Sequence, residues 1–392
     1  MREILETGPE PDQVASPRNI GVWARLRLPP PRLWKWAFLS AFGDALMQRQ
    51  VAASGMTERM LPPLIREEMS LGLIPAHEIR SMLPHIRSFD AWVSQWLELA
   101  DTAARDGDTA LELRLLLAAS RGRAIPREQL RTLHERIRQV HDAYMMTQGV
   151  AVQRVQFIWR SRVVDMLIER PEYTTSAEPR PAFVLAPGLG VLCEEMHSIA
   201  LPLLQAGAVV GRIDVAGHGG TPGPSDPEML DVMTGAARVL AMLDDVDESQ
   251  IHAFGNCSGG LLAVHAAHRF PFASVTTNGT PFRSRECVPN FIPAVRQQLA
   301  IQNHRRSFWR SLPDGYAMNG SEAVQNLPCP HYSFAGAKDR MVPLRESIWL
   351  RDQTPATVTI YEDQPHGCPG KQDEIMRLTI ERTIGTHTAT RV

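Results

Sequence analysis

One stretch of the sequence decides the fold: Ile251-His252-Ala253-Phe254-Gly255-Asn256-Cys257-Ser258-Gly259-Gly260. The apolar residues 251–254 predict a buried strand, and the apolar spacing over residues 258–268 predicts a helix directly after it. The glycines around Cys257 permit a sharp strand-to-helix turn, in which backbone segments crowd together. A turn of the form Gly-x-nucleophile-x-Gly presents its middle side chain to a substrate, so we interpret Cys257 as the nucleophile.

Cys257 lies where the predicted helix begins, a position that favours the thiolate form of a cysteine. The helix dipole and the free N–H groups of the first turn stabilise negative charge there. Ser258 is an alternative nucleophile, but it would put Asn256 and Gly260 at the flanking positions and leave Gly255 without a role. A phosphate-binding loop is disfavoured, because the turn has neither a lysine nor the Gly-x-Gly-x-x-Gly spacing.

Strand-like and helix-like segments alternate through the second half of the chain. This alternation predicts an α/β fold with a mostly parallel central sheet, covered by helices on both faces. Amphipathic helices separate the strands, and a last helix begins near Gln372. A hairpin is predicted from residues 155–160 and 163–168. The strands expected after it are residues 183–186, 209–213, 251–254, 273–277, 332–334 and 358–361.

The first half of the chain has a helical pattern instead. Residues 1–30 are polar and rich in proline, and we expect them to be flexible. Residues 31–154 are expected to form an α-helical domain with tryptophans in its core. The catalytic domain then covers residues 155–392. Within it, residues 289–326 interrupt the alternation and predict a lid-like helical insertion.

Two residues downstream are candidates for the base and acid that a nucleophilic cysteine needs. Asp339 and His366 each follow a predicted strand. The carboxyl ends of parallel strands gather at one edge of a sheet, so we expect both side chains near Cys257. Nucleophile, acid and histidine also follow one another in the order expected for such a triad. Asp363 is the alternative acid.

An acyl-transfer site also needs N–H groups that bind a developing oxyanion. The loop Ala186-Pro187-Gly188-Leu189-Gly190 follows the first central strand. We expect N–H groups of this loop, at Gly188 or Leu189, to act together with the N–H of Ser258.

Other polar residues lie near these loops. His218 belongs to Gly217-His218-Gly219-Gly220-Thr221, after the next strand, where ordering of the turn is a simpler role than catalysis. Glu194, Glu195 and His197 follow the oxyanion loop. One of them could reach the pocket, although a helix face is the simpler interpretation.

The composition excludes several classes of protein. The 392 residues have a net charge of −2 with both signs interspersed, so no nucleic-acid partner is expected. The five cysteines are irregularly spaced without a Cys-x-x-Cys pair, so we expect no metal site, no disulfides and a cytoplasmic location. The N-terminus lacks the apolar core of a signal peptide, and no apolar stretch could cross a bilayer. A small-molecule substrate and no membrane partner are therefore expected.

Together, these motifs resemble the α/β-hydrolase superfamily over about residues 155–385. The helical front half, from Ile79 to Ala119, is similar to the N-terminal domain of the FrsA-like group, which includes the 2,6-dihydroxypseudooxynicotine hydrolase. The resemblance implies an α/β-hydrolase fold with a helical cap over the active site. It also implies cleavage beside a carbonyl, no cofactor and often a homodimer.

The sequence departs from that group at Cys257, where the group has serine. A cysteine here is similar to dienelactone hydrolases and polyhydroxyalkanoate synthases, and a thiolate forms a thioester intermediate. We therefore expect hydrolysis of a C–C or ester bond, or acyl transfer, on a polyketide-like or aromatic ketone, ester or thioester. Two alternatives stay open. One is a lyase that eliminates acetate from an acetylated, tetronate-type intermediate, and the other is a non-catalytic binding protein on a hydrolase scaffold.

Overall fold

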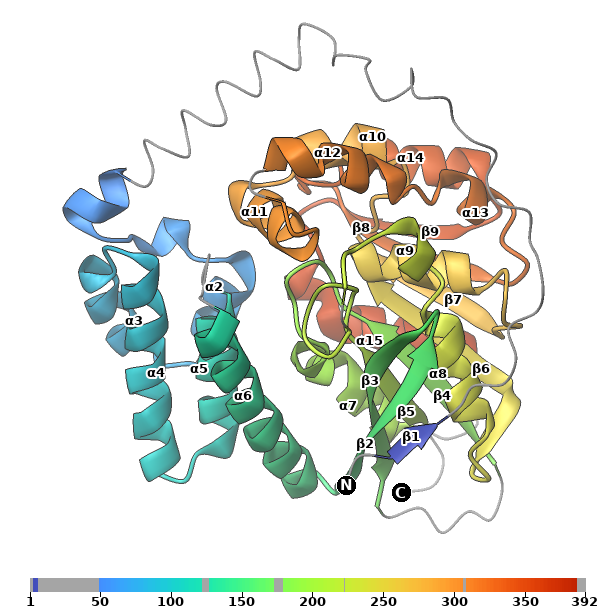
Figure 1. Cartoon of the computed structure of the whole chain (residues 1–392), viewed down its shortest axis with the longest axis horizontal. Helices are drawn as coiled ribbons and strands as arrows, with labels where there is room; N and C mark the ends of the chain where they lie inside the picture. Colours follow the sequence, from blue (N-terminus) through green and yellow to red (C-terminus); the bar gives the residue numbers. More distant parts are fainter. Residues whose placement is uncertain are drawn as a thin grey trace, which may run out of the picture.

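The computed structural model of the protein describes residues 3–5, 49–121, 127–172, 179–221, 223–305 and 308–385. Most of the segment predicted to be flexible, residues 1–30, lies outside these ranges. The described chain has a helical part and an α/β part, which lie side by side in Figure 1. The boundaries of these parts as separate domains stay a prediction.

A mixed sheet forms the centre of the α/β part, and within the described residues it has nine strands in the order β1-β2-β3-β5-β4-β6-β7-β8-β9. The strands β2 and β3 form the predicted antiparallel hairpin, and β3 also runs antiparallel to β5. All neighbours from β5 to β9 are parallel, so the predicted α/β fold is confirmed. The strand bounds are β1 Glu3–Leu5, β2 Val150–Trp159, β3 Arg162–Pro171, β4 Arg180–Ala186, β5 Val209–Ile213, β6 Val246–Asn256, β7 Ser274–Asn278, β8 His331–Gly336 and β9 Thr357–Tyr361.

The strand order brings distant loops together. After β5 the chain crosses back over β4, so β6 pairs with β4. The loop after β4, which we predict to bind the oxyanion, therefore lies beside the turn after β6, which carries Cys257. The strands β8 and β9 continue the same parallel edge on the other side of β7.

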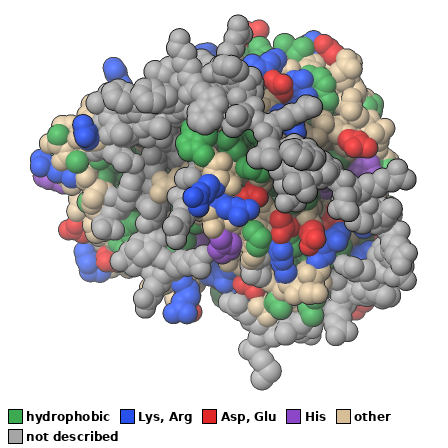
Figure 2. All heavy atoms as spheres, turned by 45° about the horizontal axis from the view of Figure 1, so that its top comes forward, with side chains coloured by type: hydrophobic (Ala, Val, Ile, Leu, Met, Phe, Trp, Pro, Cys, Tyr) green, Lys and Arg blue, Asp and Glu red, His purple; other side chains and the backbone are tan. Residues whose placement is uncertain are grey.

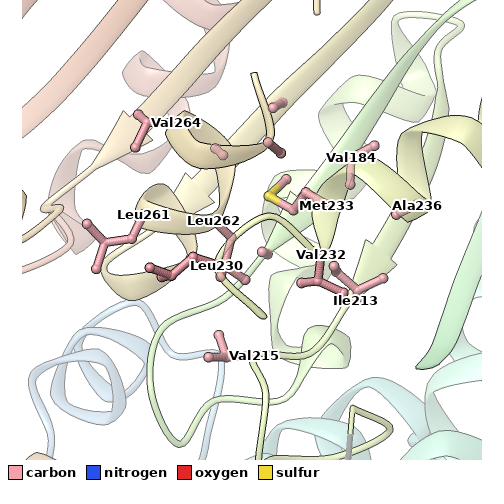
Figure 3. Packing of buried hydrophobic residues seen from close by; sticks show 14 of the residues in the cluster. Val184, Ile213, Val215, Leu230, Val232, Met233, Ala236, Leu261, Leu262 and Val264 are labelled. Atoms are coloured by element: carbon pink, nitrogen blue, oxygen red, sulfur yellow. The ribbon is translucent and has the colours of Figure 1, made fainter. Parts of the chain in front are cut away.

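Helices cover both faces of the sheet. On one face, α7 (His197–Gln205) contacts α15 (Gln372–Thr383) over a core that includes Phe183, Phe254 and Phe334. On the other face lie α8 (Met233–Ala241) and α9 (Ser258–Ala266). Figure 3 shows this second core, in which buried side chains of β4, β5, α8 and α9 pack in one cluster.

The strands of the hairpin are longer than the predicted runs 155–160 and 163–168. Charged residues interrupt the apolar pattern in both extensions, but the structure gives them charged partners. Arg154 of β2 donates hydrogen bonds to Asp142, and Glu169 of β3 accepts one from the buried Arg212. A buried charge is tolerated in a strand when it is paired in this way, and the sequence does not reveal the pairing.

The helical part has its own apolar core. Ser88 and Asp108 accept hydrogen bonds from the N–H groups of Ala91 and Leu111 and so cap the starts of α4 and α5. Trp96 of α4 is fully buried in this core. The helices are α2 Pro63–Ser70, α3 Ala76–Met82, α4 Phe89–Arg105, α5 Thr109–Ser120 and α6 Arg127–Thr147.

Short helices fill the segment after β7, where we predict a lid-like insertion. They are α10 Ser284–Cys287, α11 Pro293–Gln302, α12 Phe308–Ala317 and α13 Ser321–Gln325, and α14 (Leu344–Gln353) follows β8. In Figure 1, α11 lies between α12 and the helical part. Gln298 of α11 packs on Gly190 in the loop after β4.

Charged side chains of both signs occur on the surface of the described residues. Acidic and basic side chains are interspersed over the coloured part of the face in Figure 2, without a large patch of one sign. In the part of the chain that is described, no helix combines the length and apolarity that crossing a membrane requires.

The buried tryptophan of α4 gives a test of the helical core. Replacing Trp96 by alanine removes a large side chain that is fully buried. We expect the free energy of unfolding to fall by about 3–5 kcal/mol, because apolar contacts are lost and a cavity is left in the core. Urea-induced unfolding measures the change. The variant Leu71→Ala, at a side chain that is 63% exposed, is the control and should leave stability nearly unchanged.

Candidate active site

Cys257 occupies the turn between β6 and α9 in a strained backbone conformation. Its φ of 51° and ψ of −119° lie in the positive-φ region that side-chain-bearing residues rarely adopt. The N–H of Cys257 donates to the carbonyl of Asn278 on β7 at 2.8 Å, which holds the turn against the neighbouring strand. Strain of this kind is typical of functional residues whose surroundings fix them.

The glycines of the turn are required by close backbone contacts. A Cβ atom on Gly255 would lie 2.3 Å from the backbone of Gly259, and one on Gly259 would lie 2.1 Å from the carbonyl oxygen of Ala186. Real Cβ atoms do not approach backbone so closely, so only glycine fits. The turn and the loop after β4 are thereby packed directly on each other.

Asp339 and His366 meet at the same edge of the sheet. Asp339 follows β8, and its Oδ2 accepts a hydrogen bond from Nδ1 of His366 at 2.6 Å. Its other oxygen accepts from the N–H groups of Met341 and Val342 at 2.8 and 2.9 Å. These bonds fix the carboxylate and hold the imidazole with its Nε2 free for another partner.

That other partner is Cys257, which forms a hydrogen bond with His366. Burial alone would lower the pKa of His366, but the negative charge of Cys257 and the hydrogen bonds with Asp339 and Cys257 outweigh it. Together they raise the pKa to about 10. The arrangement therefore favours the protonated form of the imidazole.

The alternative residues lie in other surroundings. Ser258 is buried, and its hydroxyl has no hydrogen-bond partner among the described residues. Asp363 is exposed and is hydrogen-bonded to Gln364. Asp339, and not Asp363, is thus the carboxylate in contact with His366.

The loop after β4 lies against the cysteine. A Cβ atom on Gly188 would be 3.0 Å from Cβ and 3.7 Å from Sγ of Cys257. Leu189 follows in the same loop and is buried. The N–H of Ser258 belongs to the first turn of α9, where N–H groups have no acceptor within the helix. Gly188 therefore lies directly against Cys257, and the N–H of Ser258 follows it in the chain.

The acidic residues behind this loop bind arginines. Glu194 accepts a hydrogen bond from Arg154 at 2.9 Å, and Glu195 accepts one from Arg121 at 2.8 Å. His197 contacts the carbonyl of Glu194 through Nδ1. Glu194 and Glu195 thus tie the segment after this loop to arginines of β2 and of the helical part.

Cys193, Glu194 and Asp214 form a buried group with the spacing of a metal site. Their hydrogen bonds account for this arrangement without a cation. Both oxygens of Asp214 accept backbone N–H groups, from Cys193 and Gly220, and burial raises the pKa of the Cys193 thiol. The guanidinium of Arg154 on Glu194 adds positive charge, which opposes cation binding.

His218 lies apart from the triad candidates, in contact with residues that sequence reasoning missed. Its ring meets that of His134 of α6 edge to face at 5.4 Å, and its Nδ1 lies 3.4 Å from the amide of Gln298 of α11. Neither contact could be read from the sequence, because His134 and Gln298 belong to helices with no motif.

The pKa of His366 gives a test of this geometry. Replacing Cys257 by alanine or Asp339 by asparagine removes a negative charge beside the imidazole, so the pKa of His366 should fall in both variants from about 10. An NMR pH titration of the His366 ring measures it, with the exposed His77 as the unaffected control. An unchanged pKa in both variants would contradict the proposed contacts.

The same shift predicts how stability depends on pH. The pKa of His366 is raised on folding from 6.5 to about 10, so folding favours the protonated form. Its contribution to stability is therefore full below about pH 6.5 and is lost as pH rises through about 10. The variant Cys257→Ala should show a weaker loss of stability over this interval in urea unfolding.

Solved structures that resemble the chain share its fold. The crystal structure of the 2,6-dihydroxy-pseudo-oxynicotine hydrolase superimposes with a TM-score of 0.66 at 16% identity, over 82% of this chain and 96% of that one. The structure of wild-type AbyA5 gives a TM-score of 0.68 at 16% identity, over 87% of this chain and 95% of that one. Both matches extend over the helical part as well as the sheet.

Comparison by sequence identifies the family. No curated protein matches the chain. The sequence pattern of the alpha/beta hydrolase family matches residues 183–385, which is more than half of the chain. The match includes β6 with its turn, β8 and β9. The chain is therefore an enzyme of the alpha/beta hydrolase family.

Proposed function

We propose that this enzyme cleaves a bond beside a carbonyl group through a Cys257–His366–Asp339 triad. The observation that carries the proposal is the continuous contact from the carboxylate of Asp339 through the imidazole of His366 to Cys257. Nucleophile, histidine and orienting acid in such contact are the geometric signature of covalent catalysis.

The first half-reaction forms a thioester. The Sγ thiolate of Cys257 attacks the carbonyl carbon, and the carbonyl oxygen becomes an oxyanion. The N–H groups of Ser258 and Leu189, or Gly188, would bind this oxyanion. When the tetrahedral intermediate collapses, the bond to the leaving group breaks, and His366 donates its Nε2 proton to that group. The leaving atom is an oxygen, a sulfur or a stabilised carbon.

The second half-reaction releases the acyl group. Neutral His366 takes a proton from water, or from another acceptor such as an alcohol or thiol, and the resulting nucleophile attacks the thioester carbonyl. Collapse of this second intermediate expels the Cys257 thiolate, while His366 keeps the proton. The ion pair of the resting enzyme is thereby restored, and Asp339 holds one ring orientation throughout.

Acetate elimination is less well supported. In that reaction His366 would act as the base that removes a proton from carbon. A histidine whose pKa is raised to about 10 already carries its proton at neutral pH. The ion pair suits a thiolate nucleophile with an acid partner better than it suits a free base.

The substrate class follows from the resemblance and not from the geometry. We propose an aromatic or polyketide-like ketone, ester or thioester, because the fold is shared with a hydrolase of 2,6-dihydroxy-pseudo-oxynicotine. A homodimer remains a proposal, which light scattering of the purified protein tests.

Intact-protein mass spectrometry tests the proposed chemistry. After incubation with p-nitrophenyl acetate or an acetyl thioester, we expect an acetyl adduct on the wild type and none on Cys257→Ala. The variant His366→Ala should acylate much more slowly, because it lacks the group that favours the thiolate. Cys329→Ala removes another partly exposed thiol and is the matched control, which should acylate like the wild type.

Two results would count against the proposal. An adduct that persists in Cys257→Ala would mean that another residue is the nucleophile. A product that has a new double bond and contains no oxygen from isotope-labelled water would show that the enzyme catalyses elimination and not hydrolysis.

A further inference from the structure

Several buried polar atoms that have no hydrogen-bond partner among the described residues gather around the loop after β5. They are Nε2 of His134 on α6, Nε2 of His218 in the loop, and both amide atoms of Gln302 on α11. His218 is only 9% exposed and Gln302 only 1%. The backbone of Gln302 packs on Gly217, the residue before His218, since a Cβ atom there would lie 2.8 Å from the carbonyl oxygen of Gln302. We name His134, His218, Gln298 and Gln302 the polar cluster.

Such a gathering requires an explanation. Buried polar side chains nearly always have a hydrogen-bond partner, because an unpaired one has lost its bonds to water. Here the helical part, the sheet loop and the insertion each supply an unpaired group to the same place. A bound molecule with polar atoms would satisfy groups from all three segments at once.

The polar cluster is connected to the nucleophile by a short path. Gly188 lies against Cys257, and Gly190 follows two residues later, at most about 7 Å away along the chain. A Cβ atom on Gly190 would lie 2.6 Å from Cγ of Gln298, so this side chain covers the loop. The amide of Gln298 in turn lies 3.4 Å from Nδ1 of His218.

The cluster offers neutral hydrogen-bonding groups. Burial lowers the pKa of His218 to about 3 and that of His134 to about 4, so both rings are uncharged at neutral pH. The nearby carboxylate of Glu194 is already bound by Arg154. A neutral imidazole and an amide each provide a donor and an acceptor, which suits a keto or hydroxyl oxygen better than a charged group.

We propose that His134, His218 and Gln302 form a second polar subsite, which binds a keto or hydroxyl oxygen on the acyl part of the substrate. This inference rests on the proposed function, because the acyl group bound at Cys257 defines which part of the substrate reaches the cluster. In this arrangement the oxygen substituent is held between α6, the loop after β5 and α11.

Matched ester pairs test the subsite. One pair is p-nitrophenyl levulinate, which has a keto group on its chain, and p-nitrophenyl valerate, which has a methylene there. Homologous pairs with one or two more methylenes vary the distance from the reacting carbonyl. For each pair, the ratio of kcat/KM for the keto ester to that for the plain ester is measured. A general loss of activity cancels in this ratio.

The wild type should prefer the keto ester by about tenfold or more at one chain length, because a buried hydrogen-bonding site rejects an analogue that lacks the oxygen. In His218→Phe and Gln302→Leu the ratio should fall towards one. The variant His77→Phe, at an exposed histidine of α3, should keep the wild-type ratio. A wild-type ratio near one at every chain length would mean that the cluster holds only water, and would overturn the inference. So would a preference that survives in both variants.

Binding to Cys257→Ala separates this inference from the proposed function. That variant cannot form a thioester, so calorimetry reports recognition alone. Tighter binding of a keto ester than of its plain partner, lost when His218→Phe is added, would support the subsite even if the wild type forms no acyl adduct. Equal binding of both esters, together with an adduct on the wild type, would reject the subsite and leave the triad proposal intact.

Discussion

The close contact between the Cys257 turn and the loop after β4 is the constraint on which the site depends. Cys257 has a positive φ, which costs a residue with a side chain about 1–3 kcal/mol, and the surrounding backbone must impose it. Gly259 allows this by touching the carbonyl oxygen of Ala186 directly, where a Cβ atom would not fit. The same contact places Gly188 next to the Sγ atom of Cys257. One packing requirement therefore sets both the direction of the Cys257 side chain and the position of the N–H groups around it.

A second constraint joins the helical part to this loop. Arg154 binds Asp142 of α6 on one side and Glu194, just after the loop, on the other. Beneath them Arg212 donates to Glu169, and the ring of His141 of α6 lies 2.6 Å from the same guanidinium. Removing one member would leave an unpaired buried charge, which is far more costly than the net stability that an intact pair contributes. The network thus fixes the orientation of α6 and supports the loop after β4 from behind.

Two histidines close to the loop have opposite protonation, and the physical reason is the charge beside each. His366 faces Asp339 and Cys257, which together raise its pKa to about 10 although the ring is largely buried. His218 faces another imidazole, and burial lowers its pKa to about 3. The first ring is therefore protonated at neutral pH, whereas the second is uncharged.

The sequence by itself determined the fold class and the three residues now in contact at the edge of the sheet. This was possible because strand periodicity, the glycine spacing around Cys257 and the order of Asp339 and His366 are local properties of the chain. Tertiary structure alone decided the extent of the hairpin, since Arg154 and Glu169 are tolerated in strands only through partners distant in sequence. Tertiary structure also decided which residues meet in the polar cluster, because His134 and Gln302 lie on helices without a motif. Long-range charge pairing and the packing of separate helices have no periodic signal, so only the folded chain reveals them.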